Sequence, residues 1–313
     1  MGLNLLAEAA NRGLGFLFFV LLARFTGPEL FGDVRAIVSV SLIAAGVGVP
    51  FLTSVSRRAG HLAHKSALPG SDDQLNYVLA DLSAWLVATL GASAAAAIVY
   101  PHRVATVPAM MLCTIGFGCN YFAVLVARSF GRPAVVISVT AAGNILQLVL
   151  LVLMKRLEPG LMTANNVVLL YGTTFILPPL LTPFLRQFLK MKPEDFHALW
   201  QRIVSTRREY LAQFGQHASH ILMLNLDLVL LGAVGRPSLL GAYAAAKNLA
   251  LVALLPANAL FHVLIPASAG TAADGHRYLK VFVLGATATV TLGATMTLLA
   301  QPLTLMLYGD RFA

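Results

Sequence analysis

Two apolar runs separated by a short polar turn decide the class of fold: residues 13–49 read GLGFLFFVLLARFTGPELFGDVRAIVSVSLIAAGVGV. Extended to residues 3–25 and 35–55, each run has about the 20 residues that a helix needs to cross the hydrocarbon of a bilayer. The charged side chains of this stretch gather around the Gly27-Pro28 turn. The stretch therefore predicts two membrane-spanning helices joined by a tight turn.

The rest of the chain repeats this pattern. Hydrophobic residues make up 58% of its 313 residues and charged residues only 11%, against about 25% in soluble domains, and its mean hydropathy is +0.77. A soluble surface needs more polar residues than this, which excludes a soluble enzyme, a disordered chain and a fibrous repeat. We predict an all-α polytopic membrane protein of about nine transmembrane helices. The apolar segments are 3–25, 35–55, 75–99, 105–126, 134–154, 164–185, 211–233, 241–268 and 278–300.

One connection is longer than the others and differs in character. Residues 186–210 alternate Lys and Arg with Phe, Leu and Trp, which predicts an amphipathic helix lying on the membrane surface. The predicted domains are therefore an N-terminal six-helix lobe (1–185), a cytoplasmic linker (186–210) and an incomplete C-terminal lobe of three helices (211–313).

The basic residues predict an orientation. The chain carries 22 Lys and Arg against 13 Asp and Glu, a net charge of +9. Counted on alternating ends of the predicted spans, 14 basic residues lie on the side of the N-terminus and 8 on the other. Because cytoplasmic loops are the basic ones, the N-terminus is expected inside the cell. The excess charge then faces anionic membrane lipids, and we expect no nucleic acid partner.

An internal repeat relates the first three spans to the last three. A shift of 209 residues superposes three turn residues on identical ones: Pro28 on Pro237, Leu30 on Leu239, and Gly32 on Gly241. The second copy begins six spans after the first, so both have the same orientation, as in parallel-repeat transporters with a substrate site between two lobes. The alternative is chance similarity among helices rich in Leu and Ala.

Polar stripes on the first helix of each copy point to the same cavity. Glu8, Asn11 and Arg12 recur at helical spacing in the first span. The same shift places Glu8 on His217 and Asn11 on His220. Polar groups facing hydrocarbon are costly, so these residues are expected to line a hydrated cavity between the lobes. The alternative is that they snorkel at the cytoplasmic ends of their helices.

A second polar group lies in the seventh and eighth spans. Asp227 interrupts a Leu-rich run, and Lys247 beyond the next turn is its natural partner. Asn258 and His262 continue the face of Lys247. The group either contacts a substrate or coupling ion, or pins two helices together.

Signs of catalysis are missing. The histidine pairs His61/His64 and His217/His220 have no Cys or carboxylate close in sequence to complete a metal site. Cys113 and Cys119 point to different helix faces and cannot bridge. No phosphate loop, nucleophile elbow or dinucleotide fingerprint is present. We therefore predict that the chain is not an enzyme and needs no metal or cofactor.

Three segments carry a family resemblance. They are LARFTGPELFG at 22–32, NLDLVLLG at 225–232 with LGAY at 240–243, and LYGDRF at 307–312. Together they resemble the polysaccharide-transport flippases of the multidrug/oligosaccharidyl-lipid/polysaccharide (MATE-like) superfamily. The resemblance implies two lobes around a central cavity that alternate between inward-open and outward-open states.

The same resemblance implies the cargo and the place of action. The cargo is a lipid-linked oligosaccharide, a polyprenyl pyrophosphate sugar that serves as polysaccharide, O-antigen or lipopolysaccharide precursor. It is carried from the inner to the outer leaflet of the bacterial inner membrane. We expect transport to be driven either by an ion gradient, with H⁺ or Na⁺ as the coupling ion, or by downstream consumption of the cargo. Arg12 and Lys247 are the expected phosphate contacts, because cations suit that charge.

One departure from the family keeps other functions open. Its members usually have twelve or more helices, whereas about nine are predicted here. The alternatives are a multidrug/cation exporter of the same superfamily, a membrane-embedded enzyme acting on lipid-linked sugars, and a non-transporting truncated membrane protein.

Overall fold

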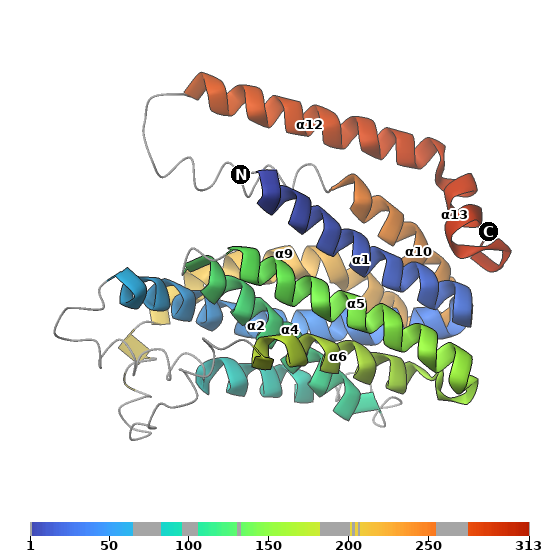
Figure 1. Cartoon of the computed structure of the whole chain (residues 1–313), viewed down its shortest axis with the longest axis horizontal. Coiled ribbons are helices and arrows are strands. Elements are labelled where there is room, and N and C mark those ends of the chain that lie inside the picture. Colours follow the sequence, from blue (N-terminus) through green and yellow to red (C-terminus); the bar gives the residue numbers. More distant parts are fainter. Residues whose placement is uncertain are drawn as a thin grey trace. The chain divides into compact units, whose positions relative to one another are not determined.

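The computed structural model contains helices and turns (Figure 1). It describes residues 2–64, 83–95, 106–129, 133–181, 201, 204–205, 207–254 and 275–312. Within these ranges there is no β-strand, so the prediction of an all-α fold is confirmed. Most of the predicted linker (186–210) lies outside the described residues.

Each predicted apolar segment overlaps a described helix. The helices are α1 (Gly2–Thr26), α2 (Pro28–His64), a helix at Ser83–Ala95, α4 (Val107–Ser129), α5 (Pro133–Leu157), α6 (Ala164–Leu181), α9 (Arg207–Val234), α10 (Pro237–Ala253), α12 (Gly275–Leu298) and α13 (Ala300–Tyr308). Two 3-10 turns, η2 (Pro159–Leu161) and η3 (Asp310–Phe312), follow α5 and α13. The second segment was expected to begin at residue 35, but α2 begins at Pro28. Arg35 is therefore inside a helix, rather than in the turn before it, and is only 6% exposed.

Several helices have the length and composition to cross a membrane. Among the described residues these are Pro28–Leu52, Thr140–Leu157 and Tyr210–Val234. Phe282–Leu298 and Ala300–Tyr308 make a fourth candidate if a pair bent by 74° counts as one span. The bend has a local cause, because Pro302 has no N–H to offer the carbonyl of Leu298. The total of about nine spans stays a prediction.

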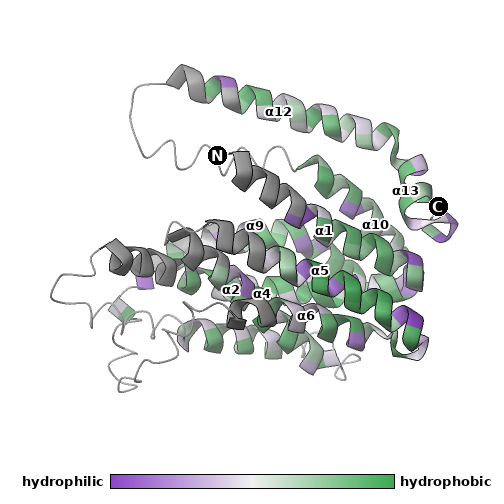
Figure 2. Cartoon of the chain, in the orientation of Figure 1, coloured by the Kyte–Doolittle hydropathy of each residue, from purple (hydrophilic) through white to green (hydrophobic). Residues whose placement is uncertain are grey.

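The surface of α12 suits a lipid environment (Figure 2). Phe282, Leu284 and Val290 are 63%, 70% and 71% exposed. A helix in water would bury such side chains, whereas acyl chains can cover them at no cost. The apolar helices therefore indicate association with a membrane.

The chain groups into two compact units. The first unit combines Met1–Gly32 with Pro237–Ala313, and the second is Asp33–Arg236. The predicted division into lobes at residues 185 and 210 stays a prediction.

Close approaches at glycine hold the second unit together. A Cβ atom on Gly172 of α6 would lie 2.7 Å from the Cα atom of Cys113 in α4. Trp85, in the helix at Ser83–Ala95, packs its ring over Gly48 of α2 and Gly118 of α4. Small residues at these positions let the helix backbones pack tightly, as membrane helices do. Cys113 is buried, and both cysteines are free, as predicted.

Candidate functional site

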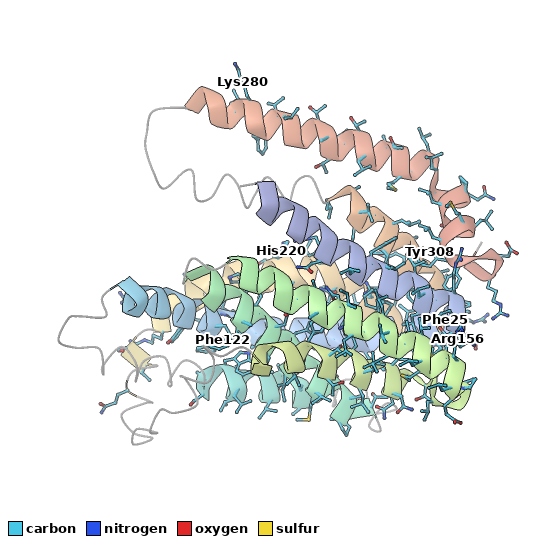
Figure 3. The ribbon with its side chains drawn as sticks, viewed as in Figure 1. Phe25, Phe122, Arg156, His220, Lys280 and Tyr308 are labelled. Atoms are coloured by element: carbon cyan, nitrogen blue, oxygen red, sulfur yellow. The ribbon has the colours of Figure 1, made fainter. Side chains whose placement is uncertain are left out.

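Three segments that lie far apart in the sequence meet inside the first unit (Figure 3). They are the α1–α2 turn, the start of α10 and the end of α13 with η3. All three belong to motifs that carried the family resemblance. We call their meeting point the motif junction, made of Arg24, Pro28, Phe31, Gly32, Pro237, Gly241, Tyr308 and Phe312.

The α1–α2 turn owes its sharpness to a Gly-Pro pair. Gly27 has a φ of 83°, a left-handed conformation that favours glycine, and its N–H donates to the carbonyl of Ala23 at 2.9 Å. Pro28 then takes the first position of α2, where its missing N–H costs nothing. The N–H of Phe31 donates to the carbonyl of Gly27 at 3.2 Å. The local sequence thus accounts for the tight turn that ends α1 and for the first turn of α2.

The two glycines matched by the repeat are in direct contact. A Cβ atom on Gly32 would lie 2.8 Å from the backbone nitrogen of Gly241 and would also overlap the carbonyl oxygen of Pro237. A Cβ atom on Gly241 would lie 2.6 Å from the carbonyl carbon of Pro28. The contact is therefore reciprocal: each glycine packs on the proline and glycine of the other copy. Such an arrangement is expected at an axis that relates two parallel repeats.

Each buried residue of α10 has a buried counterpart in α2. The buried residues of α10 are Leu240, Gly241, Ala244, Ala245, Asn248, Leu249 and Ala253. Their counterparts 209 positions earlier are buried too: Phe31, Gly32, Arg35, Ala36, Ser39, Val40 and Ala44. α2 also buries Val34, Ile37, Val38 and Ser41, whose counterparts at positions 243, 246, 247 and 250 are not buried, so the buried face of α10 matches only part of a wider buried surface on α2.

Arg24 joins the end of α1 to the end of α13. Its Nε donates to the carbonyl oxygen of Leu307 at 2.7 Å, and its Nη2 donates to that of Met306. Carbonyls in the last turn of a helix have no partner within that helix. A guanidinium there satisfies them and complements the negative end of the helix dipole.

An aromatic cluster completes the junction. The ring of Phe31 lies 5.7 Å from that of Phe312 and 6.2 Å from that of Tyr308, centroid to centroid. Phe19 of α1 lies 6.4 Å from Phe31. These separations are those of favourable aromatic pairs. Phe31 is fully buried, and Tyr308 and Phe312 are 2% and 7% exposed.

The described side chains of the predicted polar stripe on α1 differ in exposure. Asn11 is half-buried and Arg12 is exposed. Asn11 lies on the same helix face as buried Phe18 and Leu22, seven and eleven residues later. The side chain of Glu8 lies outside the described residues.

The two predicted histidines of α9 differ in the same way. His217 is half-buried, whereas His220 is exposed. Ile221 packs beside Gly46 of α2, and Tyr210 is 7% exposed. His217 falls on the face that these two residues share, so it points toward α2. Because α1 and α9 belong to different units, a cavity walled by both stays a prediction.

The second predicted polar group is described in part. Asp227 is half-buried, and its Oδ1 accepts a hydrogen bond of 2.8 Å from the N–H of Leu228. Lys247 is half-buried on α10. The two residues belong to different units, and their pairing stays a prediction. Asn258 and His262 lie outside the described residues.

The structure adds one polar position that we had not predicted. Asn248 of α10 is 6% exposed, and its Nδ2 has no hydrogen-bond partner among the described residues. Its repeat counterpart Ser39 is fully buried, and the Oγ atom has no such partner either. The sequence held a signal, because Asn248 lies seven residues after Gly241 and therefore on the same helix face.

Metal chemistry and known relatives give no further assignment. No group of three or more His, Cys, Asp and Glu side chains in the described ranges is arranged to hold a metal ion. Compared with known proteins, the chain matches no family model, no curated protein and no solved structure. The resemblance to flippases thus stays a prediction carried by the three motifs.

Proposed function

We propose that the chain is a membrane flippase that moves a lipid-linked oligosaccharide from the inner to the outer leaflet by alternating access. The observation that carries the proposal is the motif junction. Three motifs recognised separately in sequence contact one another through Arg24, Phe31 and the Gly32–Gly241 pair. Chance similarity to the family gives no reason for such a meeting, whereas a shared fold does.

The junction also supports the predicted alternation of the spans, which places these three segments at one end of their helices. With about nine spans, the α1–α2 turn, the α9–α10 turn and the end of the ninth span all fall on the outer face. Residues 24–32, 237–241 and 306–312 can touch only if they lie at the same end of their helices. Their contacts are therefore what this topology requires.

Cargo binding follows from the charges of the first unit. A pyrophosphate needs cations, and the lipid tail can stay in the bilayer. Arg12 is exposed on α1, and Lys247 is half-buried on α10. We assign the pyrophosphate to these two residues, since guanidinium and ammonium groups are the usual phosphate ligands.

The function is tested by deleting the gene and measuring on which membrane face lipid-linked repeat units accumulate. We expect accumulation on the cytoplasmic face, reversed by the wild-type chain and not by Lys247→Gln. Lys280→Gln is the matched control, because Lys280 is an exposed lysine on α12 (Figure 3). Normal outward delivery in the deletion strain would exclude the flippase, and altered drug susceptibility alone would favour an exporter.

A further inference from the structure

We propose that Ala300–Phe312 is a latch that holds the outer end of the carrier closed and is released during transport. The proposal rests on the proposed function for the assignment of this end to the outer face. The docking contacts themselves lie within the first unit and do not depend on it.

The latch is attached through two different kinds of contact. Arg24 holds the carbonyl oxygens of Met306 and Leu307 by hydrogen bonds that are exposed to solvent. Tyr308 and Phe312 bury their rings against Phe31. Exposed hydrogen bonds exchange readily with water, so the aromatic contacts contribute most of the stability of the docked latch.

The latch covers the residue next to the close contact of Gly32 with Gly241, where α2 crosses α10. We call this contact the crossing. Gly32 packs directly on Gly241 and Pro237, and Phe31 immediately precedes it. α13 and η3 also pack on α10, so the latch bridges the start of α2 and α10, and the two can part here only when the latch leaves one of them. The crossing therefore stays closed as long as the latch is docked.

A break in the helix gives the latch its own freedom of movement. α12 ends at Leu298, and α13 leaves it at an angle of 74°. Among the described residues, Leu299 is the single residue between the two helices, and it makes no side-chain capping bond to α13. A rotation at this break moves α13 and η3 as one piece, as hinges at element ends commonly do.

A single-cysteine labelling experiment tests the latch in the full chain. The reporter is Ala23→Cys, a small buried residue one turn before Gly27, in a background with Cys113→Ala and Cys119→Ala. Intact cells are treated with a membrane-impermeant maleimide. We expect Phe312→Ala to raise the labelling rate about tenfold, because the reporter is then reachable more often. Asp310→Ala, an exposed residue on the same turn, should label at the parental rate.

The outcomes separate the latch from the function. Equal rates in Phe312→Ala and its parent, or equal increases in both variants, would overturn the latch. If Phe312→Ala is not inserted at the parental level, Phe312→Leu replaces it, with about threefold faster labelling expected. Faster labelling from the inner face alone, measured in everted vesicles, would leave the latch standing and overturn the proposed orientation.

Discussion

At the scale of single residues, the absence of a side chain matters most at two positions. Gly32 and Gly241 let two backbones touch where any larger residue would overlap a carbonyl group. Arg24 has the opposite role, because its long side chain reaches carbonyls near the far end of the chain. Sequence patterns identified all three residues as members of motifs. The local sequence around each residue does not predict that the motifs are in contact.

We predict that Gly241→Ala lowers the free energy of unfolding by about 1–3 kcal/mol, because the new methyl group meets the backbone of Pro28. Thermal unfolding of the purified chain in detergent measures the change. Gly91→Ala is the matched control, since a Cβ atom there has nothing within 4 Å. Gly91→Ala should instead raise the free energy of unfolding by about 0.5–1 kcal/mol, because alanine is favoured over glycine at an exposed position inside a helix. A similar loss at both positions would mean that the close contact is not the cause.

We predict that Asn248→Leu folds at least as well as the parent and transports more slowly. The buried Nδ2 of Asn248 has no hydrogen-bond partner among the described residues, and burying such a group costs about 1–3 kcal/mol, which an apolar residue of similar size avoids. A polar group kept at such a cost is expected to serve another state of the transport cycle. Melting temperature and outward delivery of cargo are the two measurements. Full transport by the variant would speak against a role in the cycle.

At the scale of helices, hydrophobic runs predicted most elements closely. The first segment was expected at 3–25 and α1 spans Gly2–Thr26. The start of α2 was missed because Asp33 and Arg35 read as a polar turn, whereas α2 carries Arg35 inside the helix as a buried residue. Tertiary burial of a charge cannot be seen in a hydropathy pattern. The junction was missed for a related reason, since its partners lie more than 200 residues apart.

We predict that Trp85→Ala destabilises the second unit by about 3–5 kcal/mol, because it empties the space over Gly48 and Gly118. Trp85→Phe should cost much less, since the indole Nε1 makes no hydrogen bond among the described residues. Chemical or thermal unfolding of both variants checks this. Equal losses would show that the indole N–H, rather than ring packing, holds the helix at Ser83–Ala95.

At the scale of the whole molecule, the repeat and the charge bias make one prediction about topology. An offset of six spans, an even number, gives both copies the same orientation, and the basic loops predict that the N-terminus is inside. The reciprocal contact of Gly32 and Gly241 is what such a repeat should produce. The number of spans and the presence of a cavity depend on how distant parts of the chain pack together, which local sequence patterns predict poorly.

We predict that a cysteine at Gly160 is labelled by an impermeant maleimide in intact cells, whereas a cysteine at Lys280 is labelled only in everted vesicles. Both positions are exposed, and the charge count places them on opposite faces. Labelling of both from the same face would refute the predicted number or direction of the spans.

The central claim is that this chain carries a lipid-linked oligosaccharide across a bilayer, and reconstitution tests it most directly. The purified full chain is placed in liposomes whose inner leaflet holds a polyprenyl-pyrophosphate oligosaccharide with a fluorescent sugar. An impermeant glycosidase added outside then releases whatever label has crossed. We predict release with the wild-type chain and with Lys280→Gln, but release at the rate of protein-free liposomes with Lys247→Gln. If wild-type liposomes release no more label than protein-free ones, the account is wrong.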